Sequence, residues 1–450
     1  MTSPRIPPGP KGHWLGGNLP EFRTDRLDFF TRCARAYGDM VGLRLAHRRV
    51  YLVCHPDLLE EVFVTHSKNF IKHFALRLNP ILLGKGLLTS EGDFWLKQRR
   101  LIQPVFSKSR IAGYGNTMVA AAERRLALWK VGERRDIHDE MMALTLDIAA
   151  KTLFGTEVGG EAHAVAAALQ VMQDNFLRRF NSLWPPPLWL PTPGNLRMRR
   201  AARKLDDILF RIIQERRQRK IDNGDLLSLL LHARDEDDGT GMTDQQLRDE
   251  AMTLFLAGHE TTALVLSWAW YLLAQHPEAE RALWAELDEV LAGRTPTVDD
   301  WPKLKFTEMI ALEAMRLYPP AYTIGREALA DCTIGGWHVP RGTTLLLPQW
   351  VVQRDPRFFD EPERFRPERW GEERIKTLPR FAYFPFGGGP RTCIGNTFAM
   401  MEMVLVLATI GTRFRFRLQP GAKVEIQPTF TLRPLGGIPG AVECRSEAKA

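Results

Sequence analysis

The chain has 450 residues, of which 44% are hydrophobic and 25% charged, so its composition is that of a globular protein and excludes a disordered or collagenous one. Lys and Arg outnumber Asp and Glu by 61 to 53, a formal charge of +8, and this excess is spread along the sequence. The spread favours acidic partners and argues against a nucleic-acid-binding protein, whose basic residues would gather in a stripe or tail.

The cysteines and the N-terminus indicate the compartment. Five scattered cysteines form no C-x-x-C pair, so the sequence supports neither a disulfide framework nor a structural zinc site and fits a reducing compartment. Residues 1–20 lack the apolar core of a signal peptide, and no apolar run reaches the roughly 18 residues of a membrane span. Because no repeat or linker divides the chain, we expect one cytoplasmic domain over residues 1–450.

The predicted elements begin with strands and continue as helices. Short alternating apolar runs predict a β-hairpin over 41–46 and 50–54, and a late run over 343–347 is expected to join the same sheet. Between them the apolar spacing is helical, so the predicted fold class is mainly α with small β-sheets. The clearest helical segments are 111–129, 137–154, 205–217 and 243–275. The last begins with a capping box and is long enough to cross the whole domain.

Two proline-rich segments are predicted to be loops. Residues 184–195 contain Trp184 and Trp189, which are expected either to touch substrate or a membrane surface, or to cap the core. Residues 354–370, dense in Pro, Arg and Asp, are expected to form a long irregular meander, and such segments are usually functional or braced by side-chain networks.

The middle of the long helix is unusual, because the residues AGHETT over 257–262 interrupt an otherwise apolar segment. Burying Glu260 without a partner would be costly. The Thr261 hydroxyl can bond to the Ala257 carbonyl and open a bulge beside Gly258, where oxygen and water would fit. The alternative interpretation is a Thr-rich packing face.

A second unusual segment lies near the C-terminus, where residues 384–395 read FPFGGGPRTCIG and lead into an apolar helix. Cys393 is therefore expected at a helix N-terminus, where free N–H groups and the helix dipole stabilise a thiolate. The glycines let the backbone approach something bulky. Such a thiolate is a nucleophile or a metal ligand, and a buried free cysteine is the alternative.

This segment carries a family resemblance. Phe386, Gly389, Arg391, Cys393 and Gly395 match F-x-x-G-x-R-x-C-x-G, through which the chain resembles the cytochromes P-450. Other family motifs precede this segment in the order in which the family has them, so that the resemblance covers nearly the whole chain. They are W-x-x-x-R at Trp95 and Arg99, the oxygen motif at 257–262, E-x-x-R at Glu313 and Arg316, and F-x-P-E-R-F at 365–370, with Trp370 in the last place.

The departures from the family pattern are few. His259 occupies the variable place of the oxygen motif, and Gln353 stands where many relatives have His. Residues 7–10 look like the proline hinge of microsomal members, but we expect no membrane anchor before them. None of these differences affects the expected chemistry.

The resemblance implies a triangular helical prism that holds haem b between the long helix and the cysteine-loop helix. Cys393 would bind the iron, within a loop that includes Phe386 and Gly395. The propionates would be bound by Trp95, Arg99, Arg326 and Arg391, and three guanidinium groups suit an acidic edge. A buried structural network would be formed by Glu313, Arg316 and Arg369.

The implied reaction inserts one atom of O2 into an apolar substrate such as a fatty acid or terpenoid, with Thr261 and Glu260 delivering protons. We expect a monomer that receives electrons from NAD(P)H through a separate reductase and a ferredoxin or flavodoxin, since no chain remains for a fused reductase. An acidic carrier would dock at Lys97 and Arg100.

The residues expected near the substrate are uncharged, which favours a lipophilic ligand, although each is equally suited to the core. They are Phe74, Leu78, Phe255, Ala257, Ala321, Ile324 and Phe430. Three other functions stay open: a peroxide-driven peroxygenase of the same fold, a haem-binding sensor without turnover, and an unrelated helical binding protein.

Overall fold

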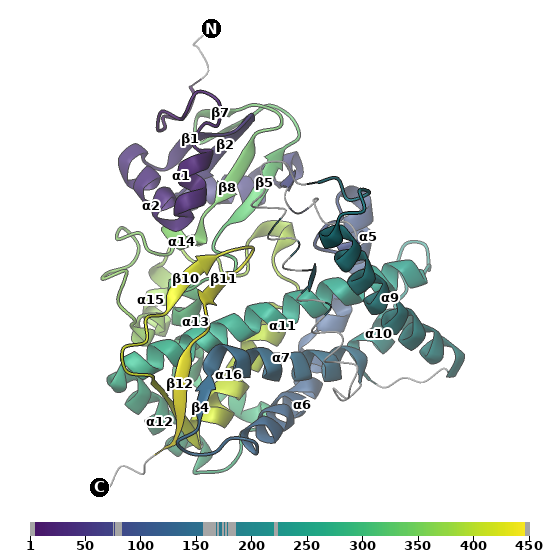
Figure 1. The fold of residues 1–450 in the computed structure, drawn as a ribbon, viewed down its shortest axis with the longest axis vertical. Helices are drawn as coiled ribbons and strands as arrows, with labels where there is room; N and C mark the ends of the chain where they lie inside the picture. Colours follow the sequence, from purple (N-terminus) through teal and green to yellow (C-terminus); the bar gives the residue numbers. More distant parts are fainter. Residues whose placement is uncertain are drawn as a thin grey trace.

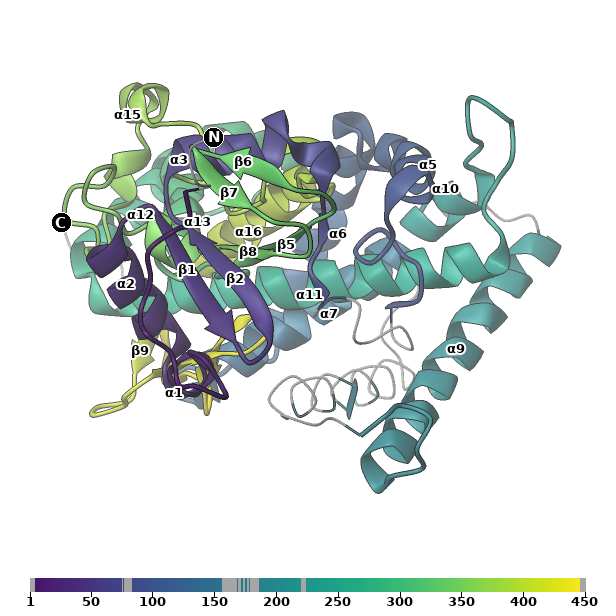
Figure 2. The same cartoon turned by 90° about the horizontal axis from the view of Figure 1, so that it is seen from above.

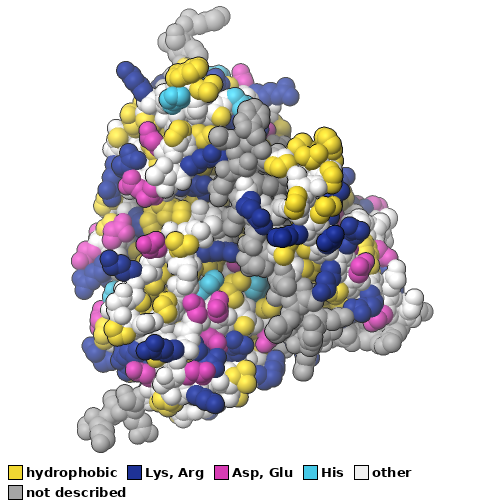
Figure 3. Space-filling view, viewed as in Figure 1, with side chains coloured by type: hydrophobic (Ala, Val, Ile, Leu, Met, Phe, Trp, Pro, Cys, Tyr) yellow, Lys and Arg dark blue, Asp and Glu magenta, His cyan; other side chains and the backbone are white. Residues whose placement is uncertain are grey.

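The protein is described by a computed structural model that covers residues 5–74, 76, 83–155, 168, 171–172, 175, 178, 186–219 and 224–445. Most strands gather near the N-terminus at the top of Figure 1, and the helices fill the region below them. The predicted mainly α fold with small β-sheets is confirmed. Lys and Arg are scattered over the face in Figure 3 among acidic side chains, as the spread of charge along the sequence suggested.

Fourteen α-helices are present in the described part of the chain. The longer ones are α2 (Arg26–Tyr37), α5 (Gly92–Ile102), α6 (Lys108–Leu126), α7 (Ile137–Phe154), α9 (Pro193–Arg219), α11 (Asp244–Gln275), α12 (Pro277–Leu291), α13 (Lys305–Leu317) and α16 (Asn396–Gly411). The shorter ones are α1 (Leu19–Thr24), α3 (Pro56–Glu60), α10 (Leu226–His232), α14 (Gln349–Val352) and α15 (Glu372–Thr377).

The long central helix α11 organises the helical part and runs across the molecule in both views (Figures 1 and 2). Its capping box forms as expected: the Thr243 hydroxyl accepts the Gln246 N–H at 3.2 Å, and the Gln246 side chain accepts the Thr243 N–H at 2.8 Å. The helix is continuous for 32 residues and ends at Gln275, before Pro277. One apolar core joins α11 to α6, α7, α9, α12, α13 and α16.

The main sheet has the strand order β1-β2-β8-β5-β3. Its strands are β1 (Met40–Leu45), β2 (Arg48–Val53), β3 (Phe70–Lys72), β5 (Ile324–Ala328) and β8 (Thr344–Leu347). The predicted hairpin is β1 with β2, and the late run is β8, which pairs in parallel with β2. A second apolar core lies between this sheet, α2 and the first part of the cysteine loop.

Three smaller sheets complete the fold. They consist of β4 (Arg134–Asp136), β12 (Pro439–Cys444) and β9 (Phe414–Leu418); of β6 (Cys332–Ile334) and β7 (Trp337–Val339); and of β10 (Glu425–Pro428) and β11 (Leu432–Leu435). The hairpin β10–β11 lies beside the middle of α11 (Figure 1), where the Trp268 indole N–H donates to the Leu432 carbonyl at 3.1 Å.

Helix boundaries were predicted best where no proline intervened. The segment 137–154 matches α7, whereas α9 begins at Pro193, twelve residues before the predicted start. The expected loop over 184–195 is wrong for its last three residues, because proline fits the first turn of a helix, where its missing N–H has no partner to lose. The meander over 354–370 is irregular apart from a short 3₁₀ turn at Pro367–Trp370.

Candidate active site

The cysteine loop is shaped by two glycines in the left-handed region. Gly387 and Gly389 have φ values of +73° and +66°. A Cβ on Gly389 would lie 1.8 Å from the Phe63 carbonyl oxygen, so only glycine allows the loop to pack there. The Cys393 N–H then donates to the Phe386 carbonyl at 2.9 Å, which closes the loop just before α16.

Cys393 is exposed to solvent, although many protein atoms lie around its sulfur. Burial raises the pKa of its thiol, while a hydrogen bond with the Gly395 backbone N–H and the positive charge of Arg99 act in the opposite direction. Both favour the thiolate, and a metal ion bound to the sulfur would favour it far more strongly. The loop therefore presents one sulfur in a position that can ligate a metal.

A short stretch of α11 is also accessible within a helix that is otherwise mostly buried. Ala257 is exposed, and a Cβ on Gly258 would meet nothing within 4 Å. The Thr261 hydroxyl donates to the Ala257 carbonyl at 2.6 Å, as the sequence suggested. The expected bulge does not form, because α11 stays helical throughout. The room at this place comes from the small side chains Ala257 and Gly258.

Glu260 is buried and paired, although the sequence indicated no partner. Its Oε1 accepts hydrogen bonds from the Thr431 hydroxyl at 2.6 Å and from Arg433 Nε at 2.7 Å. Arg433 also lies within 2.5 Å through Nη2. Thr431, just before β11, and Arg433, on β11, thus hold the carboxylate in place from positions 171 and 173 residues further along the chain.

A cluster of cations lies between the main sheet and α5, and we name Lys72, Arg326 and Arg391 the cation cluster. Arg326 is only 8% exposed and makes, among the described residues, one hydrogen bond to the Gly325 carbonyl and none to a carboxylate. Burial and the charge of Arg391 lower the pKa of Arg326 to about 10. Burial lowers the pKa of Lys72 to about 7. A buried guanidinium without an anion calls for an anionic ligand.

The fourth polar side chain here is a carboxylate. Glu91 accepts a hydrogen bond from Arg391 and one from the Lys72 backbone N–H at 2.7 Å. Lys72 Nζ donates to the carbonyls of Leu87 and Ser90 at 2.7 and 3.1 Å. Glu91 therefore offsets one cation, and the cluster keeps an excess of positive charge.

Trp95 and Arg99 lie four residues apart on α5, as expected, but they contact different groups. The Arg391 guanidinium stacks 4.2 Å from the centre of the Trp95 ring, so Trp95 belongs with the cation cluster. Arg99 donates to the Thr392 carbonyl at 2.9 Å. In this structure Arg99 therefore braces the cysteine loop.

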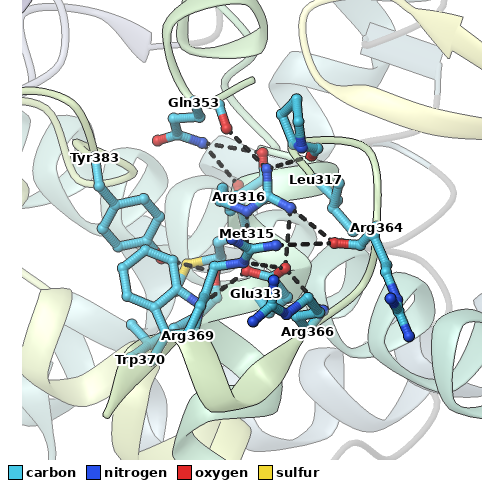
Figure 4. A network of polar contacts seen from close by, with 12 residues as sticks. Glu313, Met315, Arg316, Leu317, Gln353, Arg364, Arg366, Arg369, Trp370 and Tyr383 are labelled. Atoms are coloured by element: carbon cyan, nitrogen blue, oxygen red, sulfur yellow. Dashed lines mark hydrogen bonds and ion pairs between the residues drawn. The ribbon is translucent and has the colours of Figure 1, made fainter. Parts of the chain in front are cut away.

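The expected contact among Glu313, Arg316 and Arg369 is present and is fully buried at its centre (Figure 4). The Glu313 carboxylate accepts two hydrogen bonds from Arg316 and one from Arg369 Nε, each at 2.9 Å. The indole N–H of Trp370 also donates to Glu313 at 2.9 Å, a bond that the family's phenylalanine cannot make. Gln353 takes part by donating to the Met315 carbonyl and accepting the Phe384 N–H.

The pocket prediction is wrong for Phe255. Its ring is 3% exposed and packs on Phe154 and His259, on the side of α11 that faces α7. Burial on this side also lowers the pKa of His259 to about 4. Residues 255 and 259 share this helix face, whereas Ala257 and Thr261 lie on another.

The remaining expected residues are placed as follows. Phe74, Ala321 and Ile324 are partly buried and Phe430 is 49% exposed, while Leu78 lies outside the described residues. Trp184 also lies outside them, and Trp189 is 73% exposed. Lys97 and Arg100 are ion-paired rather than free.

Sequence reasoning missed Lys72, Glu91, Thr431, Arg433 and the role of Gln353. Each acts through a partner at least 15 residues away in the chain, so no local spacing could reveal it. The one available signal was Gln353, since an amide in place of the usual His keeps both a donor and an acceptor.

The donor set fits haem. An accessible cysteine suits the iron, and a cation cluster short of anions suits two propionates. Among the described residues no group of three His, Cys, Asp or Glu is arranged to hold another metal ion. In the same part of the chain, every helix is too short or too polar to span a membrane.

Comparisons with known proteins agree. A profile of the cytochrome P-450 family matches residues 7–438. Cyclooctatin synthase of Streptomyces melanosporofaciens is 41% identical, covering 90% of this chain and 89% of its own. Cyclooctat-9-en-7-ol 5-monooxygenase of the same organism is 40% identical, covering 86% and 84%. Pentalenene oxygenase of Streptomyces avermitilis is 37% identical, covering 88% of each.

The fold is also shared with a solved structure, the cytochrome P450DA heme domain, at a TM-score of 0.91 and 28% identity over 98% of both chains. The sequence match over nearly the whole length, the shared fold and the donor set at Cys393 lead to one assignment. The chain belongs to the cytochrome P-450 family of haem-dependent monooxygenases.

Proposed function

We propose that the protein hydroxylates a lipophilic cyclic terpenoid, and that Cys393 would bind the haem iron. One observation carries the substrate class: the accessible residues expected near the substrate, among them Ala257 and Phe430, are all uncharged. A hydrocarbon skeleton gains by burial against such residues, whereas an ionised group would lose its hydration.

The relatives support this class. Two of them are named for cyclooctat-9-en-7-ol and for pentalenene, an unsaturated alcohol and an alkene. A fatty acid is the contrasting candidate, because the Arg48 guanidinium lies 3.8 Å above the Phe74 ring and offers a cation beside the expected pocket.

In the proposed reaction the haem, when bound, supplies the activation of O2. The protein supplies a dry apolar surface, an anchored cofactor and protons. Thr261 holds its hydroxyl against the Ala257 carbonyl, beside the open position at Gly258. Glu260 is the preceding residue of the same helix. Its carboxylate is held in place by Thr431 and Arg433.

We propose that Lys72, Arg326, Arg391 and Trp95 bind the haem propionates. The excess charge of the cation cluster is the reason, since two carboxylates would supply the anions that Arg326 lacks. Arg99 would act through the cysteine loop, by its bond to Thr392. Glu313, Arg316 and Arg369 would hold the meander and not touch the cofactor.

We further propose a single cytoplasmic monooxygenase domain that takes electrons from a separate acidic ferredoxin or flavodoxin. The formal charge of +8 supports an acidic carrier. Trp189, 73% exposed in the loop before α9, is proposed as a point of contact with a lipid surface or with incoming substrate. Co-sedimentation with vesicles of the wild type and of Trp189→Ser distinguishes these two roles.

The first experiment measures the absorption spectrum of the reduced protein with and without carbon monoxide, in the wild type and in Cys393→Ser. We expect a strongly red-shifted Soret band that the substitution abolishes. The same shift in the variant would remove Cys393 as the ligand.

The second experiment titrates the ferric wild type with cyclic terpene hydrocarbons, terpene alcohols and fatty acids. A Soret shift confined to the terpenoids supports the proposed class, and a shift confined to fatty acids overturns it. Turnover with peroxide that exceeds turnover with reductase and carrier would assign a peroxygenase instead.

A further inference from the structure

The face of α5 that carries Lys97 and Arg100 is covered by an acidic segment of the same chain. Residues 233–243 connect α10 to α11 and contain four consecutive acids, Asp235 to Asp238; we name this segment the acidic connection. In Figure 2 it projects near one end of α11, beside α5. It thus lies over the residues at which an acidic carrier was expected to dock.

The contacts are specific. Lys97 Nζ donates to Asp238 Oδ2 at 2.5 Å and to the Thr240 hydroxyl at 2.8 Å. Arg100 Nη2 donates to both oxygens of Asp235 at 3.2 and 3.0 Å, and its Nη1 lies 2.5 Å from Asp237. Both cations are therefore engaged before any carrier arrives.

The acidic connection holds its shape by itself. The Asp235 N–H donates to the Thr240 carbonyl and the Gly239 N–H to the Asp235 carbonyl, each at 2.9 Å. Asp235 is buried, whereas the side chains of Asp237 and Asp238 are 69% and 50% exposed. The two outer carboxylates thus pair with Lys97 and Arg100 at the solvent-exposed surface, where such ion pairs are weak and exchange readily.

The charge balance is unfavourable for an acidic carrier. The four carboxylates of the acidic connection outnumber its own Arg234 together with Lys97 and Arg100 and leave a local charge of −1. The neighbouring residue on α5, Arg99, contacts the cysteine loop at Thr392. A carrier approaching here is repelled unless its own acidic groups replace Asp237 and Asp238 on Lys97 and Arg100.

We infer that the acidic connection is a built-in competitor of the electron carrier for Lys97 and Arg100. This inference rests on the proposed docking of an acidic carrier at α5. The competition lowers the affinity for weakly charged or mismatched acidic proteins, so that only a carrier with several well-placed carboxylates displaces the connection.

The test is the binding of an acidic [2Fe–2S] ferredoxin to the haem-loaded protein, measured as Kd by calorimetry at low and high ionic strength. Asp237→Asn with Asp238→Asn removes the two outer charges and keeps the bond from the Thr240 N–H to Oδ1 of residue 238. We expect the double variant to bind about three- to tenfold more tightly than the wild type at low ionic strength, with the gain shrinking as salt rises.

The matched control is Glu278→Gln with Glu289→Gln, which makes the same change in net charge on exposed positions of α12. In Figure 1 α12 lies at the opposite end of the molecule from α5. If both double variants bind equally more tightly, only net charge matters and the inference is overturned.

The remaining outcomes separate the inference from the docking proposal. Equal Kd for the wild type and the connection variant, with loss of binding in Lys97→Ala with Arg100→Ala, overturns the competition and leaves docking at α5 in place. If Lys97→Ala with Arg100→Ala changes Kd in neither background, the carrier docks elsewhere, and both ideas are wrong.

Discussion

Two buried groups of charged side chains in this protein differ in whether their cations are paired with carboxylates. The network around Glu313 is closed: its carboxylate accepts hydrogen bonds from two arginines, an indole N–H and the Arg366 backbone N–H. The same two arginines donate to carbonyls of the meander. The cation cluster is open, because Arg326 has no carboxylate partner among the described residues. A closed group holds the fold together, whereas an open one binds a ligand from outside the chain.

The largest effect is expected from breaking the closed group. Glu313→Gln keeps the shape of the side chain but leaves Arg316 and Arg369 buried without an anion, and we expect a loss of about 3–5 kcal/mol in the free energy of unfolding. Denaturant unfolding of the haem-loaded protein measures it. Glu361→Gln, on an exposed partner of Arg364 and Arg366, should cost less than about 1 kcal/mol. Equal losses in the two variants would remove the distinction.

The open group should respond in the opposite way. Arg326→Leu removes a buried cation without a counterion, so the unfolding free energy of the haem-depleted protein should stay unchanged or rise, while haem transfers to an acceptor globin about tenfold faster or more. Arg380→Leu, on an exposed cation paired with Glu60, is the control. A haem-depleted variant that loses several kcal/mol would show that Arg326 is structural.

The pH dependence of stability tests whether Lys72 belongs to the open group. Its pKa is lowered to about 7 by burial, while the unfolded chain titrates near the ordinary value of about 10.4. Between these values the unfolded state binds more protons, so this residue makes stability rise with pH by at most about 1.4 kcal/mol per unit. Without haem, the unfolding free energy of the wild type minus that of Lys72→Met should therefore rise from pH 7 to pH 10.

Haem should weaken that trend, because its propionates favour the charged ammonium. The same titration of the haem-loaded protein checks this. A difference between wild type and Lys72→Met that is equally steep with and without haem would place Lys72 outside the cofactor site.

The smallest effect is expected at Glu260, which is paired with Thr431 and Arg433 but, among the described residues, has fewer partners than Glu313. Thr431→Val removes one of its donors and leaves Arg433, so we expect a loss of about 0.5–1.5 kcal/mol in stability. If Glu260 delivers protons, the solvent isotope effect on turnover and the share of reducing equivalents lost to peroxide should change as well. Thr429→Val, whose hydroxyl donates to the Thr431 carbonyl, is the control for loss of hairpin order.

Features encoded by neighbouring residues could be predicted from the sequence. The capping box at Thr243, the extent of α7, the bond from Thr261 to Ala257 and the place of Cys393 before α16 all depend on residues within a few positions. Spacing and local hydrogen bonding decide such features. The start of α9 was missed for a local reason too, since Pro193 indicates a loop and a first helical turn equally well.

The side of α11 on which a residue lies was only partly predictable. Ala257 and Phe255 are two positions apart and were both assigned to the pocket, yet the first is exposed and the second packs on Phe154. The helix period places them on different faces, but only the position of α7 decides which face is covered.

By itself the sequence determined the family, the cysteine, the acid and alcohol on the long helix, and part of the charged residues near the site, among them Arg326 and Arg391. Only the tertiary structure decided their electrostatic state. Glu260 is paired through Arg433, Arg391 through Glu91, and Lys97 through Asp238, each across more than a hundred residues. An ion pair depends on where two charges lie in space and how far water is excluded, and neither is written in the local order of residues.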